Sequence, residues 1–193
     1  MIKTRLAGTE IGADFTFFAI IAMFLTLDTT GFAIMSLIVC VIHEAGHLAA
    51  MLITEQKPNK IVFRGGGIKI ASPSAQSHTA GSFFVLIAGS AVNIVLFFAL
   101  YFTLPQTNIY PVMFATLNLV IGVFNLLPIG CLDGKRLLEM FLPKRMLRVV
   151  EIIALAAVAV VVTAAIVRGG VNFTLAAAMI YVVSVDFFSR GNL

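Results

Sequence analysis

The sequence has 193 residues, of which 60% are hydrophobic and only 11% are charged, and its mean hydropathy is +1.05. Soluble globular proteins carry about 25% charged residues, so this composition excludes a soluble globule and indicates an integral membrane protein. The net charge of +4 would suggest nucleic-acid binding in a soluble protein. In membrane proteins basic residues mostly set orientation, and we therefore expect the lipid bilayer and no nucleic acid as a partner.

Long apolar runs predict an all-α polytopic membrane protein that forms one domain over residues 1–193. The expected transmembrane helices are six, at 11–27, 31–54, 81–104, 111–128, 147–167 and 171–188. We interpret the first as a retained span and not a cleaved signal, because no clear small-residue cleavage site follows it. When these spans alternate across the membrane, Arg168 alone among the 13 Lys and Arg residues falls on the outer side, so both termini are predicted to be cytoplasmic.

The second expected span, 31–54, contains three ionisable residues where lipid-spanning helices seldom have them: His43, Glu44 and His47. At about 1.5 Å per residue the segment is about 36 Å long and can cross the hydrocarbon core. An ionised side chain at the bilayer centre costs about 2.5 to 3.5 kcal/mol, and such residues usually mark a site within the helix bundle. We therefore expect these three residues to be functional.

Their spacing, H-E-x-x-H, predicts a zinc site. Residues four apart share one helix face, so His43 and His47 can bind one metal ion together, and Glu44 lies beside them to act as a base. A catalytic zinc usually has three protein ligands, and a third must come from elsewhere in the chain.

Asp133 is the preferred third ligand because of where it lies. Pro128 and Gly130 should break the fourth expected span just before it, and irregular backbone at membrane depth must line a polar cavity or be covered by protein. His78, in a polar loop, is a weaker alternative, and an ordinary Asp-Gly turn is the other interpretation of Asp133. Glu151 lies near the cytoplasmic end of an expected span, where a charged side chain costs little.

Two further features stand out between these motifs. Asn93, in the third expected span, lies about 18 Å from its start, near the depth expected of His43, while Gly89 one turn before it allows close helix packing. The loop 55–80 contains two β-prone runs around Gly65, Gly66 and Gly67, which predict a membrane-associated β-hairpin. It is either a plain surface hairpin or an edge that pairs with an extended substrate.

These motifs, in this order, resemble the site-2 protease family of intramembrane zinc metalloproteases (M50), and within it most closely the branch of the sporulation peptidase that processes a pro-sigma factor. The matching segments are His43 to His47, Gly89 to Asn93 and Asn125 to Gly134. The resemblance implies one zinc ion per chain, held by His43, His47 and Asp133, with Glu44 as catalytic base and with Asn93 and Asn125 facing the site. The PDZ or nucleotide-sensing domains of some relatives are not expected here.

The resemblance implies a function in regulated intramembrane proteolysis, in which peptide bonds of membrane-embedded or membrane-associated proteins are hydrolysed. The expected partners are such a substrate and a regulatory membrane protein. A different class of function, a transporter or sensor of zinc or another metal, could use the same buried ligands. A catalytically dead scaffold is disfavoured, because every presumed catalytic residue is present.

Overall fold

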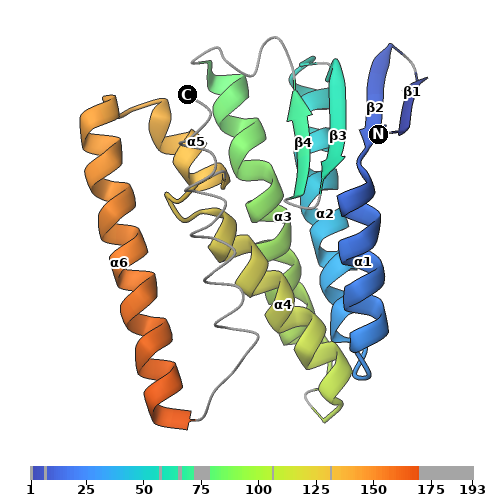
Figure 1. The fold of residues 1–193 in the computed structure, drawn as a ribbon, viewed down its shortest axis with the longest axis vertical. Coiled ribbons are helices and arrows are strands. Elements are labelled where there is room, and N and C mark those ends of the chain that lie inside the picture. The colour runs from blue at the N-terminus through green and yellow to red at the C-terminus, as the bar shows by residue number, and fades with distance from the viewer. Residues whose placement is uncertain are drawn as a thin grey trace. The chain divides into compact units, whose positions relative to one another are not determined.

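The structure is a computed structural model that describes residues 2–6, 8–56, 58–64, 67–71, 79–105, 107–130 and 132–169. The described chain is mostly helical, with one small sheet (Figure 1). It divides into two compact units, Met1–Val123 and Phe124–Leu193, and each is described by itself.

The first unit contains a four-stranded sheet in the order β1-β2-β3-β4. Its strands are β1 (Ile2–Leu6), β2 (Thr9–Ala13), β3 (Lys60–Arg64) and β4 (Gly67–Ala71). The antiparallel pair β3 and β4 confirms the predicted hairpin. The sequence analysis did not predict β1 and β2. Strand β2 is held by parallel pairing with β3, in which Glu10 lies opposite Lys60. Such a pairing between distant segments leaves no local pattern in the sequence.

Four helices complete the first unit: α1 (Phe15–Leu27), α2 (Phe32–Ile53), α3 (Ala80–Thr103) and α4 (Ile109–Asn125), the last of which ends just inside the second unit. The expected span 11–27 therefore begins too early, since residues 11–13 belong to β2. Asp14 starts α1 by accepting a hydrogen bond from the Phe15 amide, and Thr79 starts α3 by accepting one from the Ser82 amide. These are N-caps, which satisfy amides that have no partner within the helix.

Helices α2 and α3 pack side by side and carry the small core of the first unit (Figure 1). Ala50, Met51 and Val85 form a buried cluster between them. The backbones approach closely at Gly46, where a Cβ would lie 3.0 Å from the Ala88 carbonyl oxygen. Small residues permit such close packing, and here they fix α2 against the middle of α3.

In the second unit the chain leaves α4, passes through an irregular turn, and continues as α5 (Asp133–Glu139) and α6 (Lys144–Gly169). The predicted break before Asp133 is confirmed, but α4 ends at Asn125, earlier than the expected limit of 128. Pro128 lies in the turn and cannot donate a backbone hydrogen bond, which is why the helix does not continue through it. Helices α5 and α6 contact each other.

Within the described residues, three helices are long and apolar enough to cross a membrane: α2, α3 and the segment Lys144–Ala164 of α6. Helices α1 and α4 are apolar but shorter. Large side chains such as Leu52 and Phe102 are 74% and 77% exposed, as expected for surfaces that face lipid. Six spans are thus not established, and the last of them, 171–188, lies outside the described residues.

Candidate metal centre

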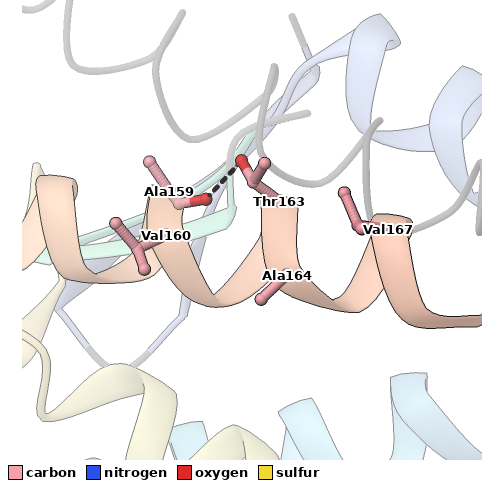
Figure 2. A pocket seen from close by; sticks show the side chains of 5 residues that line it. All are labelled: Ala159, Val160, Thr163, Ala164 and Val167. Atoms are coloured by element: carbon pink, nitrogen blue, oxygen red, sulfur yellow. Dashed lines mark hydrogen bonds between the residues drawn. The ribbon is translucent and has the colours of Figure 1, made fainter.

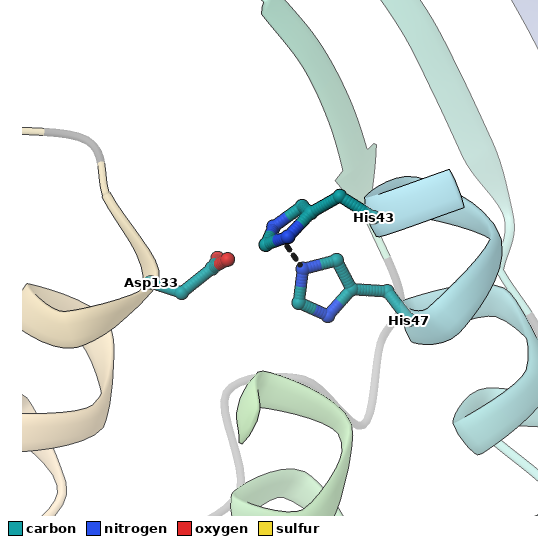
Figure 3. A group of neighbouring side chains, drawn as sticks. All are labelled: His43, His47 and Asp133. Carbon is teal, nitrogen blue, oxygen red and sulfur yellow. Dashed lines mark hydrogen bonds between the residues drawn. The ribbon is translucent and has the colours of Figure 1, made fainter. Parts of the chain in front are cut away.

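The two predicted zinc ligands lie on one buried face of α2. His43 and His47 are 4% and 7% exposed, and their Nε2 atoms are 3.1 Å apart, with the rings almost perpendicular (Figure 3). The helical spacing of four residues thus brings both imidazoles to the same point, as the sequence predicts.

The backbone of α3 holds the Nδ1 atom of His47. Its Nδ1 lies 2.7 Å from the Val85 carbonyl oxygen, which can only accept a hydrogen bond. Nδ1 must therefore carry the proton, and in the neutral ring Nε2 keeps its lone pair. This is the tautomer that a metal ligand requires, and a backbone carbonyl is a common partner for it.

Asn93 lies beside Nδ1 of His43, as the Val85 carbonyl lies beside Nδ1 of His47. Its Nδ2 lies 3.5 Å from His43 Nδ1, while its Oδ1 is buried and has no hydrogen-bond partner. The oxygen and nitrogen of an amide group are assigned from the hydrogen-bond network, and exchanging them here places Oδ1 against Nδ1. A His43 Nδ1–H then donates to the amide oxygen, and the orphaned atom is satisfied. His43 Nε2, like that of His47, is left with a lone pair.

This arrangement fits a metal ion. Two Nε2 lone pairs that face each other at 3.1 Å repel unless a cation or a proton lies between them. Tetrahedral zinc with Zn–N bonds of 2.0 to 2.1 Å places two ligand nitrogens about 3.3 Å apart. The observed separation is close to that value.

Gly89 of α3 makes room for the two rings. A Cβ at this position would lie 2.5 Å from His47 Nε2 and 2.9 Å from His43 Cε1. The sequence interpretation, which explained Gly89 by helix packing, was therefore incomplete, because the glycine also borders the imidazoles directly. Only the absence of a side chain lets α3 approach the ligand face of α2 so closely.

The other predicted site residues lie in both units. Glu44 is half-buried on α2 in the first unit. In the second unit Asn125 is the last residue of α4 and Asp133 the first of α5, and both are half-buried. Figure 3 labels the three described side chains that could serve as metal ligands, His43, His47 and Asp133. Of the three hairpin glycines, Gly67 begins β4, while Gly65 and Gly66 lie outside the described residues, as does the alternative ligand His78.

The turn before Asp133 is tightly built. Gly130 has a φ of +56°, in the left-handed region that favours glycine, and a Cβ at Gly134 would overlap the carbonyl of Leu126. Ile129, within the turn, is 1% exposed. The carboxylate of Glu151 on α6 accepts hydrogen bonds from the Gly130 amide and from Lys135.

Reasoning from the sequence missed two groups: the Val85 carbonyl, which lies against His47, and Glu151, which is bonded to the turn before Asp133. The Val85 carbonyl gives no side-chain signal, since any residue supplies the same atom. Glu151 was interpreted as a cheap charge at a helix end, but it is 5% exposed and ion-paired. The feature of the sequence that could have identified Glu151 is a carboxylate within an apolar run.

A hollow of about 490 Å³ lies along α6 in the second unit. It is lined by Ala159, Val160, Thr163, Ala164 and Val167 (Figure 2). The Thr163 hydroxyl donates to the Ala159 carbonyl of its own helix at 2.8 Å. The described residues of its lining include no metal-binding or titratable side chain.

Comparison with known proteins agrees with the geometry. Residues 106–168 match the family model described as Peptidase family M50. Among solved structures the chain is similar to the site-2 protease from Methanocaldococcus jannaschii, with a TM-score of 0.63 and 21% identity over 94% of this chain and 91% of that one. At that identity the likeness concerns the fold. No curated protein matches the chain. Residues 106–168 thus match the M50 peptidase family, and the fold of the chain is similar to that of a site-2 protease.

Proposed function

We propose that the chain is an intramembrane zinc endopeptidase that cleaves transmembrane or membrane-associated proteins, with one zinc ion bound by His43, His47 and Asp133. The observation that carries the proposal is the pair of Nε2 atoms 3.1 Å apart, each in a ring whose Nδ1 faces a group of α3. Asp133 supports it by the chemistry of its carboxylate, a usual third ligand of catalytic zinc, and by its place after a helix break.

Bound zinc would supply a Lewis acid, which lowers the pKa of water and polarises a carbonyl group. The chain's own part begins with Glu44, which follows His43 on α2. Its carboxylate takes the proton of the attacking water and returns it to the leaving amine. A carboxylate in a membrane-embedded site is suited to this exchange, because little bulk water competes for the proton.

The two asparagines have separate roles in this proposal. Asn93 holds the Nδ1 proton of His43 and so orients that ring, a role that its burial and its 3.5 Å contact support. Asn125 is assigned the role implied by the family motif, in which its amide stabilises the developing oxyanion or holds the substrate strand.

Strand β4 is the proposed docking strand for substrate. A helical substrate must unwind before cleavage, and its freed backbone groups need partners in the membrane. In the order β1-β2-β3-β4, β4 pairs on one side with β3 and forms an edge of the described sheet. An extended peptide could add to that edge by β-augmentation, and we assign this strand-pairing role to the hairpin that contains Gly65, Gly66 and Gly67.

The hairpin role is tested by deleting Gly65 to Gly67. We expect cleavage of a single-span substrate to be lost while metal content stays at the wild-type level. Retained cleavage would contradict the role of the hairpin and leave the metal site untouched.

The main test of the proposed function is Glu44→Gln, compared with wild type in co-expression with candidate single-span substrates. We expect cleavage to be abolished and zinc to stay bound after purification. The matched control is Glu55→Gln, an exposed glutamate just after the same helix, which should cleave normally. A metal transporter would still move zinc after Glu44→Gln, and that outcome would contradict the protease.

The proposal also includes membership of the sporulation branch, cytoplasmic termini and a regulatory membrane partner. The order of the motifs supports the branch, and the distribution of Lys and Arg supports the position of the termini. The regulatory partner is implied by the resemblance alone.

A further inference from the structure

A buried ion pair in the second unit involves residues for which the proposed chemistry has no use. Glu151 lies in the part of α6 that is long and apolar enough to cross a membrane, and its side chain is 6% exposed, while Lys135 on α5 is 19% exposed. A charged pair that is removed from water costs free energy unless its geometry and hydrogen bonds are good. Within an apolar helix, such a pair calls for an explanation other than stability.

The contacts of Glu151 supply that explanation. A single oxygen, Oε1, accepts a hydrogen bond from Lys135 Nζ at 2.7 Å and another from the Gly130 amide at 3.1 Å. Gly130 comes three residues before Asp133, and Lys135 comes two residues after it. One carboxylate on α6 is thus bonded to the chain on both sides of the proposed ligand.

Among the described residues, the backbone hydrogen bonds of the turn are local. Leu132, the N-cap residue of α5, makes no capping hydrogen bond with its side chain. The turn's described backbone bonds are short-range, such as Ile129 N–H to the Leu127 carbonyl and Leu132 N–H to the Ile129 carbonyl. They shape the turn but do not attach it to another helix. Glu151 supplies such an attachment from α6.

We infer that Glu151 is a positioning residue for the metal site: with Lys135 and the Gly130 amide, it clamps the turn that carries Asp133 and so sets where the carboxylate of Asp133 lies. This inference rests on the proposed function, in which Asp133 is the third ligand. It assigns no contact with metal or substrate to Glu151.

The test is metal binding by the purified full-length chain, with Zn²⁺ affinity measured by competition with a chelator and Co²⁺ absorption spectra reporting ligand geometry. Glu151→Gln keeps an acceptor but loses the charge. We expect its Zn²⁺ affinity to fall about 10- to 100-fold, the usual effect of losing a group that orients a ligand. The Co²⁺ spectrum should change as well. Lys135→Arg keeps a charged donor and should bind as wild type does.

The matched control is Glu139→Gln, because Glu139 is an exposed glutamate on α5 in the same unit. Each affinity is measured where circular dichroism shows the variant to be folded, so that loss of fold is not mistaken for loss of positioning. If Glu151→Gln bound Zn²⁺ as tightly as Glu139→Gln, with the same Co²⁺ spectrum, the inference would be overturned. Should Glu151→Gln not fold, Lys135→Gln takes its place with the same expected result and the same overturning one.

A charge swap separates the clamp from a simple ion pair. Glu151→Lys combined with Lys135→Glu restores opposite charges but sets an ammonium group against the Gly130 amide, which needs an acceptor. The clamp predicts that Zn²⁺ affinity stays low in this double variant, and full recovery would overturn it. Asp133→Ala separates the two proposals: if it left Zn²⁺ affinity unchanged, the proposed ligand set would fail, whatever Glu151 does.

Discussion

At the scale of single residues, the candidate metal centre depends on atoms that hold the imidazoles as much as on the imidazoles themselves. His47 has a backbone carbonyl behind it, His43 has an amide side chain, and Gly89 leaves the space in which both rings lie. Gly89 and the amide side chain, Asn93, each lead to a prediction that leaves the two histidines unchanged.

Gly89→Ala should displace both rings, because the new methyl group would lie 2.5 Å from His47 Nε2. We expect Zn²⁺ affinity to fall about 10- to 100-fold, as measured by chelator competition. Val95→Ala, at a position of α3 that is 67% exposed, is the control and should bind normally. Undiminished binding by Gly89→Ala would mean that the rings lie elsewhere when the metal is bound.

Asn93→Leu should remove the acceptor for the His43 Nδ1 proton, with a loss of Zn²⁺ affinity that is also about 10- to 100-fold. Asn93→Asp retains an acceptor oxygen and should keep most of the affinity. Asn118→Leu is the matched control, because Asn118 is an equally buried asparagine whose amide donates to its own helix, at the Phe114 carbonyl. If Asn93→Leu and Asn118→Leu had the same effect, burial of the amide and not its partner would be what matters.

At the scale of elements, the sequence predicted best what is local. The spacing of His43 and His47 placed both on one helix face, and Pro128 with Gly130 marked the break before Asp133, although α4 already ends at Asn125. The β3-β4 hairpin had turn glycines between two apolar runs. Strand β2 had no such signal, since its partner β3 is distant in sequence. The interpretation of Glu151 was wrong for a related reason, because its partners on α5 and in the turn are not near it in sequence.

The ion pairs of the sheet predict that the stability of the fold depends on pH. Lys60 on β3, and then Lys3 on β1, lower the pKa of Glu10 on β2, and each ammonium nitrogen lies 3.5 Å from the carboxylate. A carboxyl group whose pKa is lower in the folded state stabilises the fold above its unfolded pKa, near 4.5, and loses that contribution as pH falls through the lower folded value.

Wild type should therefore melt at a higher temperature than Glu10→Gln at pH 7, and the difference should shrink below pH 4.5, as followed by thermal unfolding in one detergent. High salt should reduce the difference as well, since the pairs are partly exposed. A difference that is independent of pH would show that the two lysines do not stabilise the sheet through Glu10.

At the scale of the whole molecule, composition alone indicated a membrane protein, but the number of spans needs more than hydropathy. Helices α1 and α4 are apolar yet shorter than a span usually requires, so their apolar lengths do not decide whether they cross the bilayer. The distribution of Lys and Arg is the independent argument, and it predicts that both termini face the cytoplasm.

Reporter fusions that are active only on one side of the membrane test this orientation. Fusions at residues 1 and 193 should both report the cytoplasm, while one at Arg168 should report the opposite side. Opposite locations for the two termini would mean an odd number of spans, and the interpretation of the charges would be wrong.

The parallel pairing of β2 with β3 also orders events during synthesis. Residues Thr9–Ala13 leave the ribosome first, but their partner Lys60–Arg64 follows only after α1 and α2 have been translated. At about 5 to 20 residues per second, β2 waits several seconds for β3. The helix that bears both histidines is therefore translated before the sheet can be completed, and until then the β2 edge that will pair with β3 is open to other strands.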